Sequence, residues 1–139
     1  MFFSQRKTQY ALRAIYELAK RHGEGPTKIS EIAKVQGIPT RFLEVILNQL
    51  KASGMVESKR GFYGGYRLIR QPGDITIGDV LRYMQKSAGH SACIACVAEE
   101  SCPFDGNCVF SDMWKRVHTE VYKIFDGTTI EDLVHHGSS

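Results

Sequence analysis

The sequence lacks a long apolar segment. None of the hydrophobic runs in its 139 residues approaches the roughly 20 residues that a membrane-spanning helix needs. No apolar stretch follows the basic residues Arg6 and Lys7, so we expect no secretory signal, no membrane partner and a cytoplasmic location. The hydrophobic fraction of 42% and the charged fraction of 24% are ordinary for a folded domain, which excludes disordered and fibrous proteins.

Cysteine is absent from most of the chain. All four cysteines lie within residues 93–108, spaced Cys93-x2-Cys96-x5-Cys102-x5-Cys108. In a reducing compartment, such crowding favours metal ligands or redox centres over structural disulfides. The second Cys-x2-Cys pair that structural zinc commonly uses is missing. Irregular spacing in a segment with small residues favours an iron-sulfur cluster, of the 2Fe-2S or 4Fe-4S type, held by these cysteines.

Acidic residues are scarce in the first half of the chain. Residues 1–70 contain 13 Lys or Arg and 5 Asp or Glu, whereas residues 71–139 contain 5 and 10. The overall net charge of +3 therefore hides a basic half and an acidic half. This asymmetry favours a polyanion as the partner of the first half.

Helical periodicity dominates the first half. The spacing of apolar residues predicts a helix over 4–22, a second over 30–36 with Ser30 as its N-cap, and a third that Thr40 caps. Gly37 is predicted to end the second helix, and Ser53-Gly54 the third. Two short helices joined by a tight turn form the helix-turn-helix pattern. The apolar face of the third helix comprises Leu43, Ile46, Leu47 and Leu50.

A change of period follows the third helix. Residues 55–60 and 65–70 are predicted to be short strands, and Gly61, Gly64 and Gly65 give the backbone freedom of a hairpin tip. A basic hairpin in this place is the wing of a winged helix-turn-helix. Its expected positive charge comes from Lys59, Arg60, Arg67 and Arg70.

The second half is predicted to contain a helix over 76–86, a cysteine-bearing loop over 87–109 and a helix of roughly four turns from Phe110. The long helix has an apolar stripe that includes Trp114 and Phe125, which we expect to pair with the same helix of a second chain. The fold class is therefore mainly α with a small β wing. Its predicted parts are a winged helix-turn-helix domain over 1–86, a cluster loop over 87–109 and a dimerisation helix with a tail over 110–139.

The second helix of a helix-turn-helix enters the major groove, with its N-terminal residues at the base edges. Val45, in this helix, offers only apolar contact. A homodimer implies a near-palindromic operator in double-stranded DNA. The predicted DNA-binding residues are Lys28, Thr40, Arg41, Glu44, Lys59 and Arg60.

Motifs along nearly the whole chain resemble one family. They are Tyr10-Ala11-Leu12-Arg13-Ala14, Arg41-Phe42-Leu43-Glu44, Lys59-Arg60-Gly61 with Gly64-Gly65-Tyr66, Ile77-Gly78-Asp79-Val80, and Thr129-Ile130-Glu131-Asp132-Leu133. Together they resemble the Rrf family (Rrf-two type) of winged-helix transcription regulators. The most specific motif, Cys96-x5-Cys102-x5-Cys108 followed by Trp114, is similar to the ligand triad of the iron-sulfur branch of that family. Other members lack such cysteines.

The resemblance implies that Cys96, Cys102 and Cys108 ligate a cluster and that Arg60 enters the minor groove. It also implies that Glu44 lies where the family places a glutamate that reads DNA.

The chain departs from the family at four positions. Ser111 and Gln9 stand where two kinds of cluster regulator have a histidine and an aspartate ligand, respectively. Cys93 is additional and can complete four thiolates, and Val45 replaces a glutamine of the reading helix.

Two alternatives remain at this level. Cys93 and Cys96 can form a regulatory disulfide in a cluster-free, redox-sensing regulator. They can also be the reactive pair of a thiol redox enzyme. Such enzymes carry the Cys-x2-Cys motif next to a βαβ unit, and the sequence predicts no such unit here. We therefore expect the protein not to be an enzyme. His90 and His118 lie where either could reach a metal. The signal, and whether the protein acts as a repressor or an activator, stay open.

Overall fold

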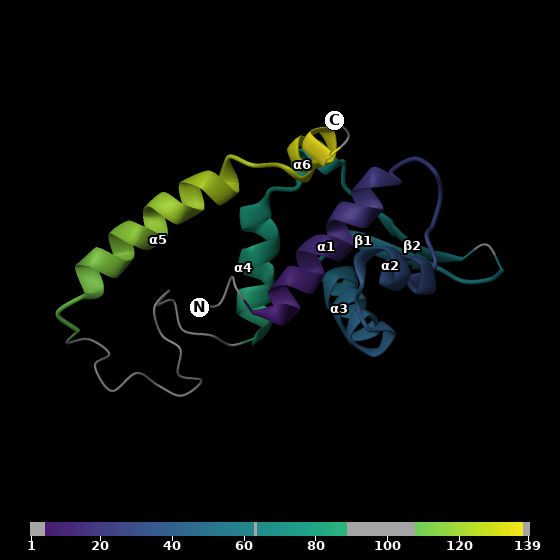
Figure 1. Ribbon diagram of the computed structural model, residues 1–139, viewed down its shortest axis with the longest axis horizontal. Helices are drawn as coiled ribbons and strands as arrows, with labels where there is room; N and C mark the ends of the chain where they lie inside the picture. The colour runs from purple at the N-terminus through teal and green to yellow at the C-terminus, as the bar shows by residue number, and fades with distance from the viewer. Residues whose placement is uncertain (1–4, 63, 89–107, 138–139) are drawn as a thin grey trace.

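The computed structural model describes residues 5–62, 64–88 and 108–137 (Figure 1). In this part the chain is mainly helical with one two-stranded antiparallel sheet, as the sequence predicts. No helix within these ranges is long and apolar enough to cross a membrane. The elements in chain order are α1 (Arg6–Lys20), α2 (Ile29–Gln36), α3 (Thr40–Ala52), β1 (Val56–Lys59), β2 (Gly65–Leu68), the short 3₁₀ turn η2 (Pro72–Asp74), α4 (Ile77–Ala88), α5 (Ser111–Asp126) and α6 (Ile130–Gly137).

The helix α1 is central to the core. It packs against α2, α3, α4 and α6 (Figure 1). Its apolar face, including Ala11, Ala14 and Ile15, is fully buried because these residues recur at helical spacing. The predicted inward residues of α3 and α4 are buried too, which confirms the periodicity argument. They are Leu43, Ile46, Leu47, Leu50, Ile77, Val80, Leu81 and Met84.

The N-cap of α2 lies two residues before the predicted Ser30, and the N-cap of α3 lies one residue before the predicted Thr40. Lys28 and Pro39 are their N-cap residues, and neither makes a side-chain cap. The prediction that Ser30 and Thr40 are N-caps is wrong, because both residues are already helical. The non-helical residues before the helices are Lys28, with ψ 144°, and Pro39, with ψ 131°. The carbonyl of Pro39, for example, accepts bonds from the amides of Phe42 and Leu43, each at 3.1 Å. The end of α2 is as predicted, with Gly37 in the left-handed region at φ +66°.

The wing is a hairpin whose strands pair from Val56 with Leu68 to Lys59 with Gly65. A third segment joins it, because Thr27 and Tyr66 exchange two backbone hydrogen bonds of 2.8 Å. The residue before the N-cap of α2 is therefore tied directly to the wing. This bridge fixes the wing relative to the helix-turn-helix.

A compact joint connects α4, α5 and α6. Thr76 and Asp79 exchange side-chain to backbone hydrogen bonds of 3.0 and 3.1 Å, and Thr129 and Asp132 do the same at 3.1 and 2.9 Å. These two capping boxes lie side by side, because Thr76 and Thr129 form an antiparallel bridge. From this joint α5 runs away from the winged body (Figure 1).

Candidate nucleic-acid interface and cysteine segment

The outer face of α3 holds three of the predicted DNA-binding residues. Thr40, Arg41 and Glu44 are all exposed. Because one helical turn takes about 3.6 residues, the stripe that contains Arg41 and Glu44 continues through Val45 and Asn48, which are also exposed. The structure thus presents these residues on one surface, opposite the buried face of α3.

The start of α2 and the tip of the wing form a second basic region. The ammonium group of Lys28 lies 4.8 Å from the ring centre of Phe62, which is 78% exposed. Lys59 ends β1, Arg60 follows it, and both are exposed. Neither makes an ion pair with another residue that the structure describes. Positive charge therefore gathers where α2 meets the hairpin.

Two other basic residues of the wing are engaged within the chain. Arg67 donates a hydrogen bond to Glu57, its cross-strand partner, and Arg70 donates one of 2.5 Å to the carbonyl oxygen of Asp74. The sequence predicts that all four basic residues put positive charge along the ribbon, and the structure adds that Arg67 pairs with an acidic residue. Its charge is balanced by Glu57, which faces it in register.

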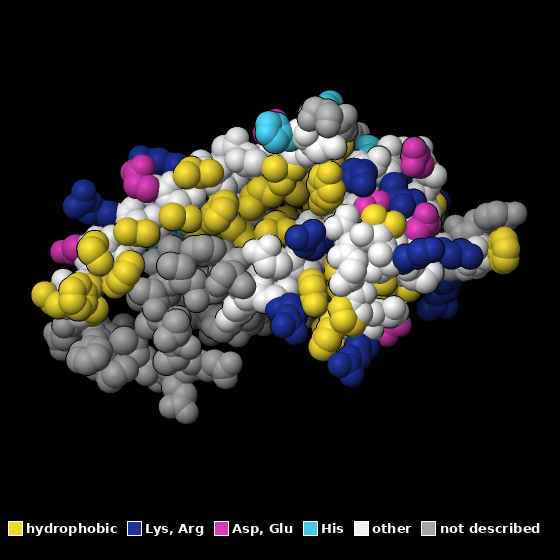
Figure 2. All heavy atoms as spheres, in the orientation of Figure 1, with side chains coloured by type: hydrophobic (Ala, Val, Ile, Leu, Met, Phe, Trp, Pro, Cys, Tyr) yellow, Lys and Arg dark blue, Asp and Glu magenta, His cyan; other side chains and the backbone are white. Residues whose placement is uncertain are grey.

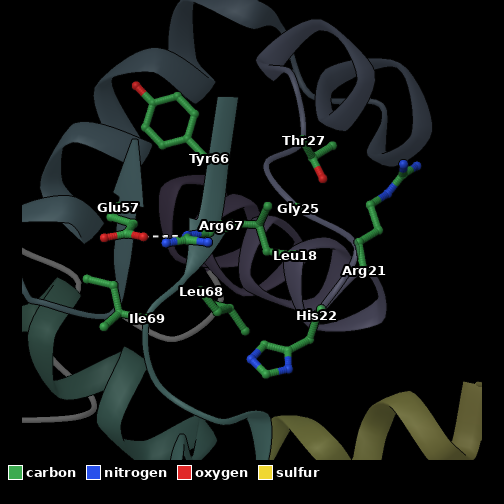
Figure 3. Close-up of a pocket in the computed structure, with 11 residues that line it drawn as sticks. Leu18, Arg21, His22, Gly25, Thr27, Glu57, Tyr66, Arg67, Leu68 and Ile69 are labelled. Atoms are coloured by element: carbon green, nitrogen blue, oxygen red, sulfur yellow. Dashed lines mark hydrogen bonds and ion pairs between the residues drawn. The ribbon is translucent and has the colours of Figure 1, made fainter. Parts of the chain in front are cut away.

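A pocket of about 550 Å³ lies between the end of α1 and β2 (Figure 3). Glu57 and Arg67 pair with each other on its wall, and the guanidinium group of Arg21 points away from them (Figure 3). The charged groups of this pocket are thus satisfied by partners within the protein. We find no catalytic arrangement among its lining residues.

An apolar groove of about 330 Å³ separates the first turn of α1 from α3. Its apolar lining residues include Tyr10 and Phe42, whose ring centres are 6.4 Å apart. The guanidinium carbon of Arg41 lies 4.8 Å from the ring centre of Phe42. Basic side chains also line the groove at the start of α1. The full lining is Arg6, Lys7, Tyr10, Phe42, Val45 and Ile46.

A buried carboxylate, which the sequence argument missed, joins α1 to α2. Glu17 is 1% exposed and accepts hydrogen bonds from Arg21 at 2.7 Å and from Gln36 at 2.8 Å. Burial by itself raises the pKa of Glu17. The hydrogen bonds from Arg21 and Gln36, with the charges of Lys20 and Arg21, outweigh burial and lower this pKa below its ordinary value. Glu17 is therefore held in its charged form.

Of the predicted cluster ligands, the structure describes Cys108, while Cys93, Cys96 and Cys102 lie outside the described residues, as does His90. The thiol of Cys108 is free and half-buried, and its carbonyl accepts a 3.1 Å bond from the amide of Ser111, the first residue of α5. Within 5–62, 64–88 and 108–137, no three His, Cys, Asp or Glu side chains are grouped so as to hold a metal.

The helix α5 is attached to α4 through its C-terminal half. Arg82 forms a two-pronged ion pair with Asp126, at 2.7 and 2.5 Å, and its guanidinium lies 4.8 Å from the ring centre of Tyr122. Tyr122 also stacks on His118 at 4.4 Å, which gives His118 a role in packing. The pair with Arg82 lowers the pKa of Asp126.

The remaining face of α5 is open. Met113 and Ile124 are 45% and 69% exposed, and Val117 and Val121 line a shallow groove of about 680 Å³. Hydrophobic side chains follow the length of this helix (Figure 2). A helix with such a face usually packs against another apolar surface.

Comparison with known proteins agrees with this geometry. The family model described as iron-dependent transcriptional regulator, Rrf2, matches residues 4–136. The transcriptional regulator CymR of Bacillus subtilis is 36% identical over 127 residues, which cover 91% of this chain and 86% of CymR. The regulator IscR of Aliivibrio salmonicida is 30% identical over 128 residues, covering 92% of this chain and 74% of IscR.

Among solved structures, that of CymR, the global cysteine regulator of B. subtilis, is similar with a TM-score of 0.77. It is 34% identical and covers 98% of both chains. The family and these relatives are transcriptional regulators and not enzymes. The chain therefore belongs to the Rrf2 family of DNA-binding, winged-helix transcription regulators.

Proposed function

We propose that this regulator binds its operator through α3, the start of α2 and the wing, and that an iron-sulfur cluster on the cysteine segment controls this binding. The observation that carries the second part is the position of Cys108. It lies three residues before α5, and the C-terminal half of α5 is anchored on α4. A change in the order of the cysteine segment therefore acts on a helix that is joined to the DNA-binding body.

The exposed basic and polar side chains support the DNA surface. Arg41, Lys28 and Arg60 lie on the three elements that a winged helix-turn-helix directs at DNA. Arg41 is suited to guanine or phosphate, and Glu44 to the amino group of cytosine. Lys28 and Lys59 are suited to phosphates, and Thr40 to a phosphate or a base edge.

The open apolar face of α5 supports a homodimer. A second copy of α5 covers Met113, Val117 and Ile124 in a two-fold arrangement, since each helix then offers the other the same surface. Such a dimer places two α3 helices on successive major grooves and predicts a near-palindromic operator.

The donor set fits an iron-sulfur cluster. Thiolates are the preferred ligands of such clusters, and the described member of the set, Cys108, has a free thiol that is not fully buried. Cys96, Cys102 and Cys108 are the proposed ligands, with Cys93 as the fourth. When bound, the cluster would supply the signal, because its occupancy or its oxidation state changes with conditions in the cell. The chain itself contributes the thiolates and the connection to α5.

The cluster is tested on full-length protein purified without oxygen. We expect a brown protein with visible absorption from sulfur-to-iron charge transfer and with iron bound in proportion to the chain. Cys93→Ser tests the fourth ligand separately. An unchanged visible spectrum would show that another residue, and not Cys93, is the fourth ligand. The control is Val109→Ala, because Val109 lies next to Cys108, is 86% exposed and carries no thiol.

A colourless, iron-free preparation that cannot be reconstituted would contradict the cluster. It would favour the second candidate, a regulator controlled by a disulfide between Cys93 and Cys96. The relative CymR, as the global cysteine regulator of B. subtilis, gives this candidate a precedent in sulfur-related control. Mass spectrometry after mild oxidation would then show the loss of two hydrogens and a cross-link between these two residues.

The wing is tested with Arg60→Ala. We expect operator binding to weaken by about 1 to 3 kcal/mol, because an exposed guanidinium that forms no ion pair with a described residue is available to enter the minor groove. Fluorescence anisotropy on a labelled duplex at fixed salt measures the change. Arg67→Ala is the matched control on the same ribbon, since its charge is already balanced by Glu57. Equal losses for the two variants would place the specific contact elsewhere.

A further inference from the structure

The exposed stripe of α3 has an apolar centre. Val45 is 54% exposed and lies one helical turn after Arg41 and three residues before Asn48. Polar side chains thus flank it along the helix, while Glu44 lies beside it. An apolar residue in the middle of a surface that faces DNA needs an apolar partner, because polar base edges that meet it lose water without gaining a hydrogen bond.

Neighbouring side chains of α3 do not cover Val45, which is 54% exposed. Its apolar neighbour Phe42 is covered in part by the ring of Tyr10 and by the guanidinium group of Arg41. Val45 lines the same groove between α1 and α3, and no ring contact from a described residue covers it. Together Val45 and Phe42 form the surface that we call the α3 apolar patch.

The charges around the patch identify its partner as a polyanion. Arg6 and Lys7 line the groove next to Val45, and Arg41 lies over Phe42. Figure 2 shows hydrophobic side chains over the region of α3 with Lys or Arg side chains on both sides of them. A purely apolar protein partner would leave the positive charges of these residues without a counter-charge. A DNA duplex offers negatively charged phosphates beside its base edges.

In the major groove of DNA, the apolar group that a base pair presents is the C5-methyl group of thymine. We propose that Val45 is a specificity-determining residue that packs on the C5-methyl group of a thymine in each half-site. This inference rests on the proposed placement of α3 in the major groove. The inference identifies one base of each half-site as thymine. It also predicts that Glu44, beside Val45, faces an adjacent base pair.

The test uses DNA selected by the full-length protein from a library of randomised duplexes. Each thymine of the selected half-site is replaced in turn by deoxyuridine, which removes only the methyl group. We expect one position at which binding falls by about fourfold per half-site, the value of one buried methyl or methylene contact. Replacing that base pair by one containing 5-methylcytosine should recover part of the affinity lost with unmethylated cytosine.

Val45→Ala should bind the thymine and uracil duplexes with nearly equal affinity. The matched control is Val35→Ala, because Val35 is a valine of similar exposure, 50%, on α2 and away from the stripe. This control should keep the preference for thymine. A preference that survives in Val45→Ala, or wild-type protein that ignores every thymine methyl group, would overturn the inference.

Arg41→Ala separates this inference from the proposed function. If Arg41→Ala weakens binding while the methyl test fails, α3 faces DNA and only the role of Val45 is refuted. If neither Arg41→Ala nor Val45→Ala changes binding to the selected DNA, the placement of α3 fails, and the inference fails with it.

Discussion

Gly65→Ala is expected to lower the free energy of unfolding by roughly 2 to 4 kcal/mol and to abolish specific DNA binding. Gly65 has φ +152°, and a Cβ atom at this position would lie 2.3 Å from the carbonyl oxygen of Thr27. That oxygen accepts the hydrogen bond from Tyr66 that ties the wing to the segment before α2. The methyl group therefore forces the bridge open, and the wing loses its fixed position.

Gly25→Ala is the matched control for Gly65→Ala. Gly25 also has a left-handed backbone, at φ +89°, but nothing lies within 4 Å of an added Cβ atom. It should cost about 1 to 2 kcal/mol from backbone strain alone and leave DNA binding largely intact. Urea denaturation and anisotropy measure the two effects. Equal losses of stability would show that strain, and not the close approach to Thr27, determines the cost at Gly65.

Glu17→Ala is expected to cost about 2 to 3 kcal/mol. The change removes the buried carboxylate that accepts hydrogen bonds from Arg21 and Gln36, and it leaves the half-buried amide of Gln36 without this partner. Arg21 keeps its second partner, Glu31, at 2.8 Å, which limits the loss. An equally stable Glu17→Ala protein would show that water replaces the carboxylate without cost.

The stability that Glu17 contributes should depend on pH. Its pKa is lower in the folded chain than the ordinary value of 4.5, so the unfolded chain takes up a proton first as the pH falls. The advantage of wild type over Glu17→Gln is therefore full at neutral pH. It is lost progressively as the pH falls below 4.5 and through the folded pKa. Denaturation of the two proteins at a series of pH values measures this difference, and a difference that stays constant as the pH falls through 4.5 would contradict the role of the Glu17 charge.

Helical periodicity was sufficient to predict the helices of the first half of the chain and their buried faces. The spacing of Leu43, Ile46, Leu47 and Leu50 predicts both α3 and its buried face, because only one register hides all four side chains. The helix starts were less accurate. Ser30 and Thr40 have the right chemistry for N-caps, but a helix can also begin from an extended residue such as Pro39, whose backbone already has the required geometry.

The charge pattern predicted a basic surface but not its internal partners. The cross-strand pair of Glu57 with Arg67 depends on the hairpin register, which is not set by a count of charges. The burial of Glu17 likewise depends on how α1 packs against α2. In contrast, the exposure of Val45 follows from the periodicity of α3, which leaves it outside the apolar face.

The joint at Thr76 and Thr129 has a mechanical consequence. Paired capping boxes, a backbone bridge and the Arg82–Asp126 ion pair all hold the same end of α5. A helix of 16 residues is about 24 Å long, so Cys108, three residues before α5, lies at the end of the helix that is remote from this joint. A small rotation of α5 at the joint would displace Cys108 by a much larger distance. A restraint on Cys108 would likewise limit rotation at the joint. Through α5 and this joint, the thiol of Cys108 is connected to the winged body.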